Sequence, residues 1–157
     1  MQTPLINIMD LQKLVGLSVN VPEDKINPHI LSAQNWQLKD IMGKDCMVAL
    51  QDRYASNTLS TEDEGLLVYV TPFLVYHAYS KYIRASTMIS TGSGIIQMTG
   101  DNMGQATSGE KNLMAQEYEN NAEAYTGYIA DYLEENKAYY TCYDEDESRQ
   151  NAATYFI

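Results

Sequence analysis

The feature that most constrains the fold is a stretch from Ser86 to Gly109 that is too rich in glycine to form a helix. A glycine in a helix interior costs about 1 kcal/mol relative to alanine. The glycines are Gly92, Gly94, Gly100, Gly104 and Gly109. Between them, the partly β-branched run Ile95–Thr99 predicts a short strand. Because a two-stranded ribbon is only marginally stable alone, we expect a hairpin or loop that rests on its own helices or on another chain.

The residues before this stretch predict a group of helices, because their apolar side chains recur at steps of three and four. Asn7 is a suitable cap for a short helix that ends at Gly16. A second helix is expected to begin at Pro22 and to end at Gly43. Asp45 is the expected cap of a further short helix.

Two prolines leave helix boundaries open. Pro28 either lies inside the second segment or starts a new helix behind a cap at Asn27. Pro72 lies in the most apolar segment, which begins at a capping box of Ser60 and Asp63 and is expected to be the central helix. This helix either kinks at Pro72 or starts afresh there.

After the glycine-rich stretch, the helical period returns at Gly109 and continues for about 30 residues, a rod of roughly 45 Å. One stripe of this helix consists of Met114, Tyr118, Ala122, Tyr125, Ile129, Tyr132 and Asn136. The acidic run Asp144–Glu147 follows, and beyond it lies the apolar tip Tyr155–Ile157. This tip either docks on a neighbouring molecule or folds back on its own helices.

These patterns predict a mainly α fold: a small helical bundle with one long C-terminal helix and a projecting β-hairpin or loop between the last two helices. Residues 1–143 are expected to form a single domain, in which 86–109 make the hairpin or loop. Residues 144–157 are expected to form an acidic tail with an apolar tip. A chain of 157 residues can bury a core as one domain.

The charge balance argues against a protein that reads nucleic acid. The chain has 10 Lys+Arg against 21 Asp+Glu, a net charge of −11. Such a surface repels phosphates, although DNA could pass along an acidic wall without binding. No run approaches the roughly 20 apolar residues of a membrane span. The first residues do not follow the pattern of a signal peptide.

No group of side chains has the pattern of a catalytic or cofactor site. His29 and His77 lack a second ligand or a nucleophile at a meaningful spacing, and we expect His77 to be packed and hydrogen-bonded. No phosphate-binding lysine and no helix follow the turn Gly92–Gly94. The acidic clusters Glu62–Glu64 and Asp144–Glu147 are interpreted as helix-end charge and a solvated tail. We therefore predict no enzymatic activity, no metal and no cofactor.

The two cysteines, Cys46 and Cys142, lie far apart in the sequence and lack the spacing of a metal site. The favoured interpretation is two reduced thiols in a protein that is assembled inside a cell.

Aromatic residues indicate where the chain could meet a partner. It has 13 tyrosines against 2 phenylalanines, and tyrosine suits half-buried and interfacial positions because it buries a ring and keeps a hydroxyl. These tyrosines either edge a helical core or form large contacts between subunits. For Trp36 we favour packing against a neighbouring helix of the same chain, and the alternative is an anchor for another subunit.

Several short segments stand in an order that resembles a known family. They are Asp10–Leu14, Val21–Ile26, Ile30–Gln34, Ile41–Gly43, Gly94–Gln97 and Asp101-Asn102. Their order resembles the head–tail connector (adaptor) proteins of tailed bacteriophages, and among these the neck ring proteins of crAss-like gut phages. The resemblance covers residues 5–140, and the acidic tail departs from it.

The resemblance implies a structural role in the virion neck, after assembly in the host cytoplasm. Such proteins form a homo-oligomeric ring, commonly of twelve copies, beneath the portal protein. The ring extends the DNA channel, lets DNA pass without binding it, contacts no membrane, and docks further neck or tail proteins. The alternative, from the residues alone, is a small helical protein-interaction or regulatory module without enzymatic activity.

A closed ring repeats one head-to-tail contact, so each copy needs two different surfaces. The expected donor side consists of Ile95, Ile96, Gln97 and Met98, together with Tyr155, Phe156 and Ile157. A helix face near Trp36 is the expected receiving side.

Overall fold

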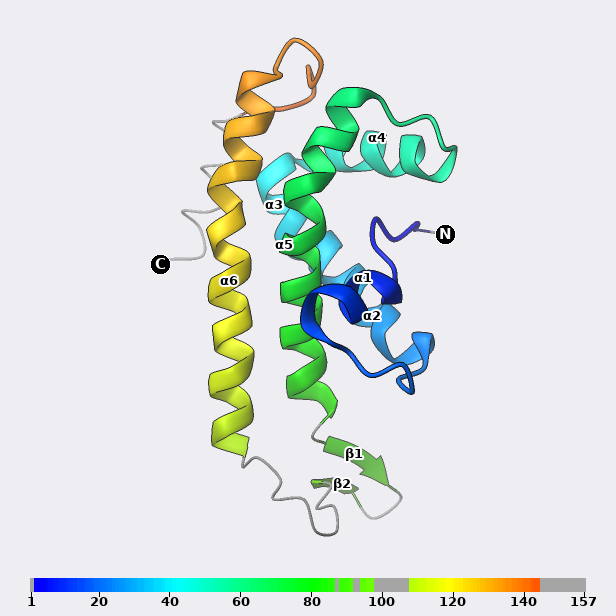
Figure 1. Ribbon diagram of the computed structural model, residues 1–157, viewed down its shortest axis with the longest axis vertical. Helices are drawn as coiled ribbons and strands as arrows, with labels where there is room; N and C mark the ends of the chain where they lie inside the picture. Colours follow the sequence, from blue (N-terminus) through cyan, green and yellow to red (C-terminus); the bar gives the residue numbers. More distant parts are fainter. Residues whose placement is uncertain (1, 87, 92–93, 98–107, 145–157) are drawn as a thin grey trace.

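The computed structural model describes residues 2–86, 88–91, 94–97 and 108–144, and shows a small bundle of helices (Figure 1). Its frame is a pair of long helices, α5 (Thr61–Ser86) and α6 (Ser108–Glu135), which lie side by side and run in opposite directions. The shorter helices are α1 (Ile8–Val15), α2 (Glu23–Ala33), the π-helix η1 (Gln34–Leu38), α3 (Lys39–Met42) and α4 (Lys44–Ala55). They lie mainly on the side of α5 that faces away from α6. The predicted mainly α bundle with a long C-terminal helix is confirmed.

A short hairpin separates the two long helices. Strands β1 (Met88–Thr91) and β2 (Gly94–Gln97) pair antiparallel, with Met88 opposite Gln97 and Thr91 opposite Gly94. The pair projects beyond the end of α5 (Figure 1). The prediction of a hairpin or loop between the last two helices is therefore confirmed.

Local hydrogen bonds confirm the predicted helix ends. Asn7 and Asp10 form a reciprocal capping box at the start of α1, which ends at Gly16 with a left-handed φ of 67°. At the start of α5, the Asp63 N–H donates to Ser60 Oγ at 3.1 Å, and the Ser60 N–H donates to Asp63 Oδ2 at 3.2 Å. These contacts join residues three apart, so sequence spacing suffices to predict them.

The helix boundaries near the prolines and Asp45 differ in part from the expectation. α2 runs through Pro28 and α5 runs through Pro72, so neither proline starts a new helix. The prediction of Asp45 as a cap is wrong, because α4 begins at Lys44 directly behind Gly43. The φ of 79° at Gly43 redirects the chain between α3 and α4 without a polar cap.

The core lies between α5 and the helices around it. The fully buried α5 side chains include Leu66, Val70, Phe73 and Leu74. The buried residues of α6 are Ala115, Ala122, Ile129 and Leu133. The predicted stripe of α6 is thus largely correct. The buried face is rotated slightly from the prediction, so that Ala115 is buried in place of Met114, which is 42% exposed.

Candidate functional site

An open groove of about 520 Å³ lies between the N-terminal segment, η1, α3 and α4. We call it the Trp36 groove. Its apolar lining includes Trp36, Met47 and Val48, and its charged lining consists of Lys39, Lys44 and Asp52. The indole of Trp36 is 63% exposed, and Val48 is 42% exposed. The groove therefore offers apolar surface to a partner beside basic side chains.

Two buried glutamines fix one wall of the groove. The Gln34 side chain donates through Nε2 to the Thr3 carbonyl at 3.1 Å and accepts from the Leu5 N–H at 2.9 Å. Gln51 of α4 also donates to the Thr3 carbonyl, at 3.3 Å. These amides satisfy backbone groups of the N-terminal segment, which pairs with no strand in the part of the chain that the structure describes. The N-terminal segment is thereby held against η1 and α4.

The π-helix η1 explains the exposure of Trp36. The Lys39 N–H donates to the Gln34 carbonyl, five residues back, so this turn is wider than an α-helical turn. The wider turn keeps Leu38 in the core while Trp36 faces outward. The favoured interpretation, that Trp36 packs against a neighbouring helix, is therefore wrong. The sequence could not reveal this, because a one-residue change of helical register leaves no mark in it.

The structure does not gather the predicted interface residues into one place. Ile95, Ile96 and Gln97 belong to β2, which follows the C-terminal end of α5. Trp36 belongs to η1 and borders α4, which precedes the N-terminal end of α5. The remaining predicted residues lie outside the described part of the chain: Met98, Tyr155, Phe156 and Ile157.

The sequence does not single out Lys44 and Val48 as residues of a groove. They stand four residues apart in the sequence and share one face of α4 with Gln51. This spacing can be read from the sequence. However, an exposed valine on a helix indicates a binding groove only when another element is known to form the opposite wall.

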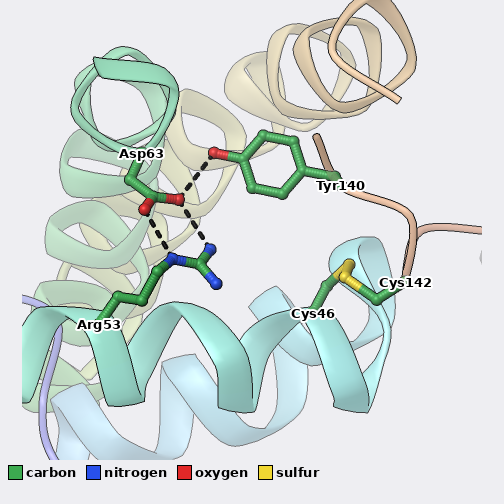
Figure 2. Close-up of a disulfide and its surroundings, with 5 residues drawn as sticks. All are labelled: Cys46, Arg53, Asp63, Tyr140 and Cys142. Atoms are coloured by element: carbon green, nitrogen blue, oxygen red, sulfur yellow. Dashed lines mark hydrogen bonds and ion pairs between the residues drawn. A yellow bond between two sulfur atoms is a disulfide. The ribbon is translucent and has the colours of Figure 1, made fainter. Parts of the chain in front are cut away.

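A buried carboxylate holds the residues after α6 against α4 and α5 (Figure 2). Asp63 is fully buried and accepts from Arg53 Nε at 2.7 Å and from Nη2 at 2.8 Å. The hydroxyls of Tyr139 and Tyr140 donate to the same carboxylate at 3.0 and 3.1 Å. Burial acts to raise the pKa of Asp63, but the hydrogen bonds, led by that from Arg53, lower it to about 2.

The Asp63 network corrects the interpretation of Glu62–Glu64 as helix-end charge alone. Asp63 points into the protein, whereas Glu64 is exposed. Burial and the negative charge of Asp63 raise the pKa of Tyr140, so its hydroxyl stays protonated and can donate. The role of this carboxylate is to hold the fold together.

Cys46 of α4 and Cys142 form a disulfide, with their Cα atoms 5.3 Å apart (Figure 2). The prediction of two reduced thiols is therefore wrong. The chain returns to α4 after α6 and brings together cysteines that are 96 positions apart. Cys46 is buried and Cys142 is exposed.

His77 lies buried between α5 and α6. Its ring meets Phe73 edge-on with centroids 4.6 Å apart, which confirms the predicted packing. Its buried Nε2 has no hydrogen-bond partner among the described residues, and lies 3.6 Å from Oε1 of Glu123. Burial lowers the pKa of His77 to about 4, Lys81 acts in the same direction, and Glu119 opposes both. The imidazole is therefore neutral near pH 7.

Tyrosine rings cover the seam between α5 and α6. Tyr69 stacks on Tyr128 with centroids 5.8 Å apart, and Tyr76 stacks on Tyr118 at 6.1 Å. Tyr79 meets Tyr118 edge-on at 4.8 Å. These contacts join helices of one chain, so the tyrosines of the seam edge the helical core, which is the first of the two predicted roles.

The fold and these sites define an all-helical bundle built on two antiparallel long helices, with an open groove among its shorter helices. The chain belongs to a family of unknown function (DUF6712), whose model matches residues 38–153. The matched region includes both cysteines and the Asp63 network, whereas Trp36 precedes it. No curated protein and no solved structure matches the chain. Among the described residues, no helix has the length and apolar character needed to cross a membrane.

Proposed function

We propose that this chain is a structural virion protein that forms a head-to-tail connector ring under the portal protein of a tailed bacteriophage. The observation that carries the proposal is the presence of two dissimilar surfaces on one subunit, the Trp36 groove and the β1–β2 hairpin. Helix α4, which borders the groove, precedes α5, and the hairpin follows α5, whose 26 residues span about 39 Å. A ring with one repeated head-to-tail contact needs dissimilar surfaces on each subunit, and these two surfaces do not have to bind each other.

Four of the segments that carry the resemblance to connector proteins can be placed in the described elements. Asp10–Leu14 lies within α1, and Val21–Ile26 spans the start of α2. Ile41–Gly43 covers the end of α3 and the glycine that leads into α4, and Gly94–Gln97 is β2. The likeness therefore concerns parts of four elements and the order in which they follow one another, and this order supports the proposal.

The charge of the chain fits a protein that lines a DNA channel. With a net charge of −11, the subunit repels the phosphates of passing DNA, so the ring extends the channel without holding the genome. The disulfide fits a virion that assembles in the reducing host cytoplasm and is later released, because disulfides persist outside the cell. In this role the ring sits in the neck and docks the next neck or tail protein.

Electron microscopy of the purified protein mixed with the portal protein from the same genome tests the proposal. We expect a ring of added density beneath the portal, coaxial with its channel. Portal particles without added density would exclude the neck assignment. They would favour the alternative of a monomeric or dimeric helical interaction module, for which the Trp36 groove would be the binding surface.

A pair of variants tests the contribution of the hairpin. Ile95→Asp with Ile96→Asp is expected to leave the helical circular dichroism unchanged and to abolish the ring. Val19→Asp is the matched control, because Val19 is 79% exposed in the loop between α1 and α2. If the double variant loses its helices, the two isoleucines belong to the core of the subunit.

A further inference from the structure

We propose that the Trp36 groove binds residues 145–157 of a second copy of this chain. The inference rests on the proposed self-assembly and names the contact through which one subunit holds the next. Four observations carry it: the charges of the groove, its exposed apolar surface, the face of α4 on which it opens, and the composition of the segments that could fill it.

The charges of the groove and of this segment are complementary. Lys39 and Lys44 line the groove together with one acid, Asp52, although acidic residues outnumber basic ones two to one in the whole chain. The run 145–147 is entirely acidic, and Arg149 is the one basic residue of the segment. Opposite charges at the rim steer a partner to the groove and set its orientation.

The apolar parts also correspond. The tip Tyr155–Ile157 supplies two aromatic side chains and one aliphatic side chain. The groove offers Trp36 and Val48, which are large apolar side chains exposed to solvent. Asn35 also lines the groove, and its buried Oδ1 has no hydrogen-bond partner among the described residues, so a rotation of this side chain would present a free acceptor to a peptide.

The position of the groove on α4 favours a segment from another copy. Lys44 and Val48 lie on the groove face of α4, whereas Cys46 is two residues from each, which is roughly half a turn away. Cys142 is bonded to Cys46, so the chain leaves α4 on the face opposite the groove. The part of the chain just before residue 145 therefore lies on the face of α4 away from the groove, which favours a head-to-tail contact with a second copy.

The hairpin is a weaker occupant of the groove. Residues 94–98 carry no charged side chain, so they cannot pair with Lys39 or Lys44. Filling the groove with this run would bring no charge to pair with the two lysines, for which the groove itself holds one acid, Asp52.

The test uses the full chain and its single tryptophan, which lies in the groove. A groove variant combines Trp36→Ala, Lys39→Glu and Lys44→Glu, all at exposed positions. It contains no tryptophan, so it contributes no tryptophan emission. A tip variant, Tyr155→Ser with Phe156→Ser, keeps Trp36 and an intact groove. Each variant alone has only one half of the contact.

We expect each variant to sediment as a monomer and their equimolar mixture to form a heterodimer, because one intact groove then meets one intact tip. The Trp36 emission of the tip variant should shift to shorter wavelength when the silent groove variant is added. The charge reversals alone should weaken association of the wild-type chain by about tenfold or more.

The matched control reverses Lys13 and Lys25 to glutamate, which changes the net charge equally at exposed positions outside the groove. This control should associate as the wild-type chain does. A mixture that stays monomeric, or an emission that does not shift, overturns the inference. A wild-type chain that sediments as a monomer also overturns it, because each groove would then be filled by the subunit's own segment. The sedimentation experiment contains no portal protein, so its result does not depend on the neck assignment. If the variants form a heterodimer but electron microscopy shows no added density under the portal, only the neck assignment is refuted.

Discussion

Tyr140 donates its hydroxyl hydrogen to Oδ1 of Asp63 at 3.1 Å, across a separation of 77 positions in the chain. Both side chains are buried, and Arg53 neutralises the carboxylate from the other side. The contact fixes the residues after α6 against the start of α5. Because Cys142 follows two positions later and is bonded to α4, the hydrogen bond and the disulfide act on the same short segment.

Replacement of Asp63 by asparagine is expected to destabilise the protein by about 3 kcal/mol, because it leaves the Arg53 guanidinium without its counter-charge. The new amide nitrogen would also face hydrogen-bond donors. Urea unfolding monitored by circular dichroism measures the loss. The control is Glu64→Gln, an exposed acid in the same first helical turn, which should change stability by only a few tenths of a kcal/mol. Equal effects of the two substitutions would contradict the assigned role of Asp63.

The starts of α1 and α5 could be predicted from the sequence, because the hydrogen bonds that define them connect residues close together in the chain. The capping boxes of Asn7 with Asp10 and of Ser60 with Asp63 depend on residues three positions apart. The spacing Ser60–Asp63 could not show that the same carboxylate also binds Arg53 and Tyr140. Those contacts exist only after the chain has returned along α6.

The disulfide is expected to contribute about 2–4 kcal/mol, because it closes a long loop between Cys46 and Cys142 and so restricts the unfolded chain. Dithiothreitol should lower the melting temperature of the wild-type protein. It should leave that of Cys46→Ala with Cys142→Ala unchanged, at the value of the reduced wild type. Thiol counting by mass spectrometry before reduction should find no free thiol, and two free thiols in the oxidised preparation would contradict the pairing.

The sequence could identify one residue of the candidate site, Trp36, but not the residues that surround it. Trp36 could be named from the sequence as an interface candidate, since an aromatic residue off the apolar stripe is conspicuous. The lysines that border it come from α3 and α4, and the wall opposite α4 is the segment that Gln34 holds. A groove made by several elements appears only when they pack, and the register shift in η1 that exposes the indole has no sequence signal.

Stability is expected to fall in acid in two steps with separate causes. Burial, the largest cause, lowers the pKa of His77 from 6.5 to about 4, with Lys81 adding to this effect and Glu119 opposing it. Between these two pH values the unfolded chain binds a proton that the folded chain does not, so about 3 kcal/mol is lost as pH falls through this window. The pKa of Asp63 is lowered to about 2, so its contribution is complete above pH 4 and is lost below.

The variant His77→Gln should remove most of the pH dependence of the unfolding free energy between pH 6.5 and 4, and should leave the step below pH 4 in place. His29→Gln is the control, because His29 is only half-buried and its pKa is lowered less by burial and by Lys81. Chemical unfolding at half-unit pH intervals measures both slopes. An unchanged slope in His77→Gln would show that another group titrates in this window.

Two glycine-to-alanine substitutions in the long helices should have opposite signs. Gly127 of α6 has nothing within 4 Å of an added Cβ, so Gly127→Ala should stabilise the protein by up to about 1 kcal/mol through helix propensity. At Gly65 of α5 an added Cβ would collide with the Tyr132 ring, whose Cζ lies 2.9 Å away. The hydroxyl of Tyr132 donates to the Glu62 carbonyl at 3.0 Å, so the ring cannot move aside without losing this bond. Gly65→Ala should therefore destabilise the wild type, but should stabilise the Tyr132→Ala variant, in which the obstacle is gone. Urea unfolding of the four proteins gives the coupling energy between positions 65 and 132, and a coupling near zero would mean that α5 and α6 do not approach each other through this glycine.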